Sequence, residues 1–87
     1  MTSTREEIFV GIDVSKRQLD MAVWGQEDIW QCGNDEPGIR EVVKQLTAMV
    51  PTLVVVEASG GWEMTLTAEL AFAKLPVAVV NPTRVRN

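Results

Sequence analysis

The chain has 87 residues, of which 46% are hydrophobic, so it is long enough for one small domain and too apolar to be disordered. Its 8 basic and 12 acidic residues give a net charge of −4, which is the wrong sign for binding nucleic acid by bulk electrostatics alone. A single cysteine and no histidine exclude an internal disulfide, a zinc cluster and histidine acid–base catalysis. Because there is no apolar run near the ~18 residues of a membrane span and no signal peptide, we expect a cytoplasmic protein without a membrane partner.

The first third of the chain predicts three strands. Apolar residues alternate with their neighbours at 8–13 and again at 19–24, with a polar turn at 15–18 between them. Gly25 and Gln26 form a tight connection to a weaker third strand at 27–32. We expect these three strands to form an antiparallel meander.

A helix follows the meander. Residues 33–38, GNDEPG, form a turn cluster in which Pro37 suits the first turn of a helix. Apolar residues then recur three and four positions apart until Pro51 ends the pattern, namely at Ile39, Val42, Val43, Leu46, Met49 and Val50.

Two apolar strands enclose a second predicted helix. The run at 53–56 is apolar throughout, which indicates a strand buried on both faces. The helix is marked by Trp62, Leu66, Leu70 and Ala73, and the run at 77–80 is the last strand. With right-handed crossovers, the order β-β-β-α-β-α-β predicts an α/β fold with a ribonuclease H-like mixed sheet. The tail NPTRVRN carries no stop signal, so we expect the domain to be truncated after its fifth strand.

Asp13 and Glu57 end the first and fourth predicted strands. If those strands are adjacent and parallel, both carboxylates emerge at one sheet edge, where open α/β sheets bind their ligands. Two neighbouring acids repel unless a cation joins them, and hard oxygen ligands favour Mg²⁺ or Mn²⁺. A turn or cap residue is the simpler interpretation of Asp13 alone, whereas Glu57 helps no turn. We predict a catalytic, metal-binding pair suited to phosphodiester chemistry.

Other residues are candidates for contacting a nucleic-acid backbone. Ser59, Gly60 and Gly61 precede a helix, where glycines let a phosphate approach backbone N–H groups. Two pairs of cations, Lys16 with Arg17 and Arg84 with Arg86, lie in the first turn and in the tail. A flexible connection, a solvated turn and a solvated tail are the alternative interpretations.

The remaining distinctive side chains have structural interpretations. We expect the tryptophans to be core or sheet-face residues rather than base-stacking platforms, which applies to Trp24, Trp30 and Trp62. Cys32 is interpreted as a small buried hydrophobe and Asp20 as a solvent-facing strand residue.

Three stretches carry a resemblance to a known family. FVGIDVSKRQLDMAV at 9–23, VVVEASGGWEMTLTAEL at 54–70 and PVAVVNPTRVRN at 76–87 resemble, in order and spacing, the N-terminal domain of DEDD-type transposases of the insertion-sequence 110 group. GIDVSK alone is a modest signal, whereas its combination with VEASGGW and VVNP is specific.

The resemblance implies a recombinase. The family's catalytic domain is similar to the Holliday-junction resolvase RuvC and binds divalent metal through four acids, Asp-Glu-Asp-Asp. By motif, the first is Asp13 and the second Glu57, and the other two lie further along in the family. The family also has a C-terminal domain with a nucleophilic serine, and some members are directed by a guide RNA. The implied partners are DNA, such an RNA as in those members, and further copies of the full-length protein. With two of four acids, we expect weak Mg²⁺ binding and no catalysis by these 87 residues alone.

Two other classes stay open at this stage. Actin-like and sugar-kinase ATPases share this core, but their first hairpin turn is rich in glycine, serine and threonine so that it wraps a phosphate. Here that turn reads VSKRQ, with no glycine after Asp13. The other class is a non-catalytic interaction domain that keeps the fold, against which the acids at both strand ends argue.

Overall fold

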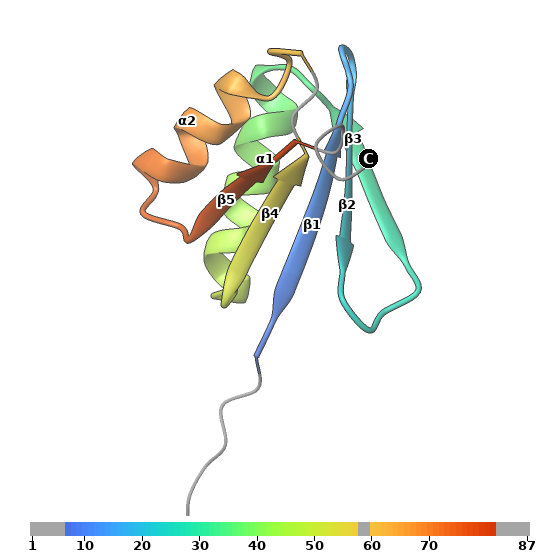
Figure 1. The fold of residues 1–87 in the computed structure, drawn as a ribbon, viewed down its shortest axis with the longest axis vertical. Helices are drawn as coiled ribbons and strands as arrows, with labels where there is room; N and C mark the ends of the chain where they lie inside the picture. The colour runs from blue at the N-terminus through green and yellow to red at the C-terminus, as the bar shows by residue number, and fades with distance from the viewer. Residues whose placement is uncertain (1–6, 58–59, 82–87) are drawn as a thin grey trace, which may run out of the picture.

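The computed structural model describes residues 7–57 and 60–81, which form one mixed sheet and two helices (Figure 1). The elements follow the predicted order, and their bounds are β1 Phe9–Val14, β2 Gln18–Val23, β3 Ile29–Gly33, α1 Glu36–Met49, β4 Leu53–Glu57, α2 Met64–Phe72 and β5 Val77–Val80.

The strands are arranged in the order β3-β2-β1-β4-β5. The pairs β1–β2 and β2–β3 are antiparallel, and the pairs β1–β4 and β4–β5 are parallel. Short hairpins join antiparallel neighbours, whereas each parallel pair needs a helical crossover, which α1 and α2 supply. The predicted meander and the predicted pairing of the first with the fourth strand are both confirmed.

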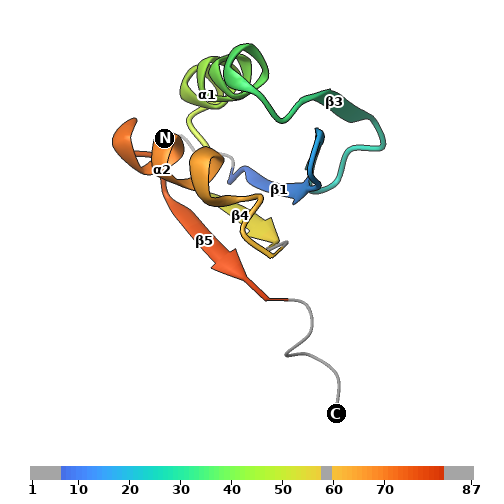
Figure 2. The ribbon, with the colours of Figure 1, turned by 90° about the horizontal axis from the view of Figure 1, so that it is seen from above.

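Both helices pack on the same face of the sheet (Figure 2). Alternate residues of β1 point into the core between the sheet and the two helices. The buried core residues are Val10, Ile12, Val14, Leu19, Met21, Ile39, Val42, Leu46, Val54, Val56, Leu66 and Leu70. The prediction that the fourth strand is buried on both faces is wrong. Val54 and Val56 are fully buried, but Leu53 and Val55 lie on the other face and are only half-buried. We call that other side of the sheet the open face.

The helix α1 has specific signals at both ends. Asp35 caps its start, because the carboxylate accepts a 2.9 Å hydrogen bond from the backbone N–H of Gly38. Val50 adopts the left-handed conformation (φ 53°) and its N–H donates to the carbonyl of Leu46, so the helix ends directly before Pro51.

The helix α2 is shorter than predicted, since Trp62 and Ala73 lie outside it. Gly60 and Gly61 have φ values of 68° and 109°, a left-handed backbone that turns the chain before the helix begins. Within the described residues, neither helix is long and apolar enough to cross a membrane.

Candidate functional site: an acid pair at the end of the sheet

Asp13 and Glu57 lie side by side. They are register partners across the parallel β1–β4 pair, so their Cα atoms face each other at the carboxyl ends of adjacent strands. Neighbouring strands are about 4.8 Å apart, which brings the two side chains within reach of a common ligand. Both side chains are exposed and alternate with buried residues of the same strands, so both lie on the open face. The structure thus brings the two predicted acids together.

A third carboxylate lies in the same row. Asp20 on β2 is the antiparallel register partner of Asp13, and it is half-buried on the open face. Its Oδ1 accepts a 2.7 Å hydrogen bond from Nε2 of Gln18. The row across the sheet therefore reads Gln31, Asp20, Asp13, Glu57 and Val80.

The interpretation of Asp20 as a merely solvent-facing residue missed this neighbourhood. The length of the β1–β2 hairpin could have predicted this pairing. Only Lys16 and Arg17 connect the last paired residues, because the N–H of Ser15 donates to the carbonyl of Gln18 at 2.9 Å. A two-residue connection fixes the register and places Asp20 opposite Asp13.

The donor set of the acid pair suits a divalent cation but does not complete a site. Two carboxylates supply hard oxygen ligands of the kind that Mg²⁺ and Mn²⁺ prefer. Among residues 7–57 and 60–81, however, no three acidic, histidine or cysteine side chains are grouped so that they could hold a metal ion together. Asp13 and Glu57 therefore fit part of a metal-binding site, with several coordination positions left to water or to other oxygen ligands.

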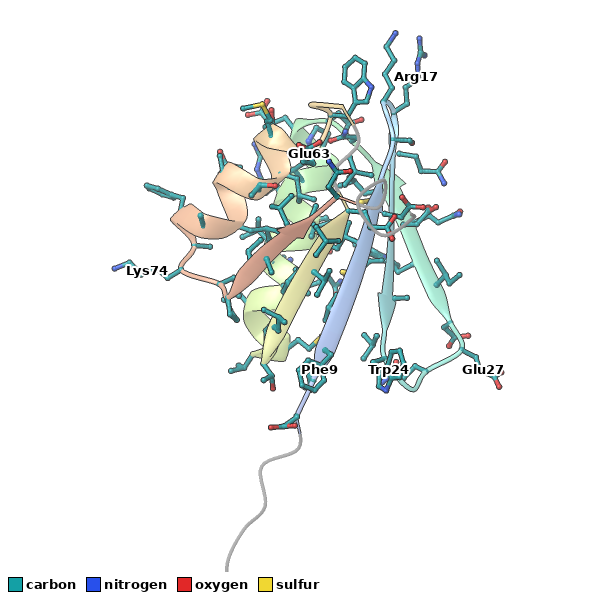
Figure 3. The ribbon with its side chains drawn as sticks, viewed as in Figure 1. Phe9, Arg17, Trp24, Glu27, Glu63 and Lys74 are labelled. Atoms are coloured by element: carbon teal, nitrogen blue, oxygen red, sulfur yellow. The ribbon has the colours of Figure 1, made fainter. Side chains whose placement is uncertain are left out.

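The predicted cations at the hairpin tip lie beyond the acids. Lys16 directs its ammonium toward the ring of Trp62, with Nζ 5.6 Å from the ring centroid. Arg17 is exposed at the end of the sheet (Figure 3). Of the glycine-rich link, Gly60 is exposed. Ser59, Arg84 and Arg86 lie outside the described residues.

Asn34 joins the loops that follow the two acid-bearing strands. Its Nδ2 donates to the carbonyl of Ser15 at 2.9 Å and to the carbonyl of Trp62 at 3.1 Å. Its backbone N–H donates to the carbonyl of Arg17 at 2.9 Å. One side chain between β3 and α1 thus connects the β1–β2 turn with the start of α2. No sequence pattern had identified this residue.

Two of the three tryptophans are not where the sequence predicted. Trp30 packs against the core, as expected. Trp24 is 85% exposed because β2 ends at Val23 and leaves it in the following turn. Trp62 is 48% exposed because the glycine turn carries it away from the core before α2 starts.

Cys32 is half-buried against the core, and its thiol donates to the carbonyl of Gly38. Burial raises the pKa of this thiol, and the carboxylates of Asp35, Glu41 and Asp20 raise it further. A thiol with a raised pKa stays protonated at neutral pH, so Cys32 is neither an activated nucleophile nor a ready metal ligand.

Two solved structures share this fold. The RuvC of T. thermophilus, in complex with a Holliday junction substrate, superimposes with a TM-score of 0.65 at 19% identity, and the match covers 90% of this chain and 68% of that one. The resolvase of Fowlpox virus, in complex with Holliday junction DNA, gives a TM-score of 0.57 at 18% identity, covering 87% of this chain and 61% of the resolvase. The fold is therefore ribonuclease H-like, as predicted, and the chain spans about two thirds of the length of each resolvase.

At the level of sequence, a search among curated proteins gives no match. The model of the DEDD transposase family of the insertion-sequence 110 group, described as "Transposase", matches residues 10–87. Since this match extends over nearly the whole chain, the protein belongs to that transposase family.

Proposed function

We propose that these 87 residues are the N-terminal part of the RuvC-like catalytic domain of a DNA transposase or site-specific recombinase. The observation that carries the proposal is the register of Asp13 and Glu57 at the carboxyl ends of two adjacent parallel strands. The family assignment and the shared fold support it, and both similar structures hold Holliday junction DNA.

In this proposal, Asp13 and Glu57 are the first two of four metal-binding acids. Their carboxylate oxygens would hold Mg²⁺ or Mn²⁺, which would supply Lewis-acid activation for phosphodiester cleavage. The chain's own residues would fix the position of such an ion. The parallel ladder fixes the separation of the two carboxylates, and their exposure leaves the opposite side free for a scissile phosphate.

DNA is the proposed substrate. In this proposal, Lys16 and Arg17, the exposed cations beyond the acid pair, contact backbone phosphates, and such contacts position a strand without reading its sequence. Gly60 offers a turn with an open backbone on the α2 side. A guide RNA and assembly into a homo-oligomer are further proposals that rest on the family resemblance. Phosphate contacts by Ser59, Arg84 and Arg86 are proposals that rest on the sequence pattern.

The first test is a titration of the 87-residue chain with Mn²⁺, monitored by backbone NMR. We expect paramagnetic broadening centred on the backbone amides of Asp13 and Glu57, because Mn²⁺ binds between their carboxylates. Asp13→Asn and Glu57→Gln should each abolish that localised broadening while leaving the rest of the spectrum unchanged.

Matched controls are available at the other end of the sheet. Glu27 lies far from Arg17 (Figure 3), and Asp28 is its exposed neighbour, so Glu27→Gln and Asp28→Asn remove the same charges without touching the pair. Broadening spread evenly over all acidic residues, or broadening that survives Asp13→Asn, would refute a common metal site. It would favour a non-catalytic interaction domain with the same fold.

A further inference from the structure

A pocket of about 780 Å³ lies beside the acid-bearing end of the sheet, between the first turn of α1, the start of α2 and the tip of the β1–β2 hairpin. Pockets that hold small organic groups are roughly 300–1,000 Å³ and mostly apolar, with a few polar groups at fixed positions. The apolar wall here consists of Ile39, Val43 and Trp62. The pocket is therefore large enough for a planar heterocycle, and it offers an aromatic surface.

The charges of the lining show which part of a ligand fits inside. Arg40 forms an ion pair with Glu36 at 3.3 Å, and the Asp35 carboxylate caps α1. Glu69 adds a further negative charge at the lining. A phosphate is thus repelled from the interior, whereas an uncharged ring is not. Lys16 forms no ion pair with any described residue and supplies a cation at the hairpin tip.

The aromatic wall is held in place from two sides. Asn34 Nδ2 binds the carbonyl of Trp62 and the carbonyl of Ser15, which directly precedes Lys16. The Lys16 ammonium lies over the Trp62 ring, 5.6 Å from its centroid. An exposed tryptophan that already has a cation over it and a fixed backbone carbonyl loses little freedom when a ring stacks on it.

The position of the pocket relates it to the acid pair. Lys16 is three residues beyond Asp13, and Trp62 is five residues beyond Glu57, so at most about 10 Å and 17 Å of chain separate them. The acids lie on the open face and the pocket on the helix-covered side, and Lys16 at the hairpin tip lies between them. A nucleic-acid strand whose phosphate lay at the acids would reach the pocket by passing over this tip. A base within a duplex is stacked on both faces and cannot enter, whereas an unpaired base can.

We propose that this pocket receives an unpaired base of the nucleic-acid strand on which the acids act, with the base stacked on Trp62 and its phosphate beside Lys16. The inference rests on the proposed function and adds a preference to it, namely for strands with an unpaired nucleotide close to the scissile phosphate. Bases of DNA and of RNA both have a planar face that can stack on tryptophan, so the pocket can receive a base from either nucleic acid.

The test is a titration of the 87-residue chain with short single-stranded oligonucleotides at low salt. NMR monitors the indole N–H resonances of the three tryptophans. We expect the Trp62 resonance to shift with oligothymidine, while those of Trp24 and Trp30 stay in place. An abasic oligonucleotide of the same length carries the same phosphates and no bases, so it should leave the Trp62 resonance unmoved. Oligouridine compared with oligothymidine shows whether RNA or DNA is preferred.

Substitutions then measure the stacking. Trp62→Leu should weaken oligothymidine binding about 5- to 150-fold, which corresponds to a stacking contribution of about 1–3 kcal/mol per base. Trp62→Phe keeps an aromatic face and should retain most of the affinity. Trp24→Leu is the matched control, because Trp24 is more exposed and lies at the opposite end of the sheet (Figure 3). It should leave binding unchanged.

Any one of three outcomes would overturn the inference. The Trp62 resonance could stay in place with every oligonucleotide, or the abasic strand could bind as tightly as oligothymidine. The third is that Trp62→Leu and Trp24→Leu weaken binding equally. None of these bears on the Mn²⁺ titration, which tests the proposed function separately. If instead Mn²⁺ fails to localise while oligothymidine still stacks on Trp62, the pocket stands as a nucleic-acid site and the catalytic proposal falls.

Discussion

At the scale of single residues, the acid row, which consists of Asp20, Asp13 and Glu57, contains the proposed metal ligands and also like charges that repel one another. Asp13 has a carboxylate opposite it on each side, from Glu57 across the parallel pair and from Asp20 across the antiparallel pair. Like charges directly opposite each other on one face of a sheet destabilise it. Three neighbouring acids are therefore unfavourable for the isolated fold, and a cation bound at the row would relieve the repulsion.

Neutralising the acid that is not a proposed ligand should reveal this penalty. Without divalent cations and at low ionic strength, Asp20→Asn should raise the free energy of unfolding by about 0.2–1 kcal/mol. Asparagine keeps an acceptor oxygen for Gln18, so the change isolates the charge. Urea denaturation measures the effect, which should shrink at high salt. Asp28→Asn, outside the row, should have little effect. A loss of stability in Asp20→Asn would show that the row is not under repulsion.

At the scale of elements, the sheet and the loops beyond it are held by different interactions. The positions of Asp13 and Glu57 depend on the β1–β4 ladder. The positions of Lys16 and Trp62 depend on the turn and on the link to α2, which Asn34 joins. The acid pair and the neighbouring pocket therefore have separate supports, even though they lie at the same end of the molecule.

Removing the amide of Asn34 should loosen the loops and leave the acids in register. Asn34→Ala deletes two hydrogen bonds, each contributing about 0.5–1.5 kcal/mol. We expect faster hydrogen exchange at the amides of Ser15 in the β1–β2 turn and Met64 at the start of α2, with Mn²⁺ broadening retained. Gln45→Ala is the control, because among residues 7–57 and 60–81 its side chain bonds only to Glu41, on the exposed side of α1. If exchange at both loops stays at the wild-type rate, Asn34 does not hold them.

At the scale of the whole molecule, the described part of the fold is a sheet with one covered face and one open face (Figure 2). The acid row lies on the open face. The rest of that face is largely apolar, and a hollow of about 370 Å³ there is bordered by Phe9, Gly11, Ala22, Trp24 and Val55. Any further ligands that complete the metal site have to approach from this side.

A half-site should not catalyse strand cleavage. We expect no cleavage of a branched DNA by the 87-residue chain in Mg²⁺ or Mn²⁺, because the described residues contain no group of three potential ligands around a common point. Two carboxylates leave Mg²⁺ mostly hydrated and poorly fixed. A gel assay with labelled junction DNA measures this. Cleavage that disappears in Asp13→Asn would show that two acids suffice.

The order of the elements and the acid pair could be predicted from the sequence because they depend on local patterns. Alternation in β1 and β2, the three-and-four spacing of α1 and the apolar runs of β4 and β5 each report burial along one element. The right-handed crossover then leaves one arrangement in which β1 and β4 are neighbours, so Asp13 and Glu57 meet. The family resemblance depends on the same residues and is confirmed.

The tertiary structure alone decided which faces are covered and which loops touch. An apolar run such as that of β4 shows that a strand is buried, but it does not show on how many sides, and here Leu53 and Val55 face away from both helices. The pairing of Asp20 with Asp13, the exposure of Trp62 and the contact of Asn34 with two loops all join residues distant in the chain. Local periodicity shows how a residue lies within its own element. The pocket beside the acids instead forms where three elements pack together, namely the β1–β2 hairpin, α1 and α2.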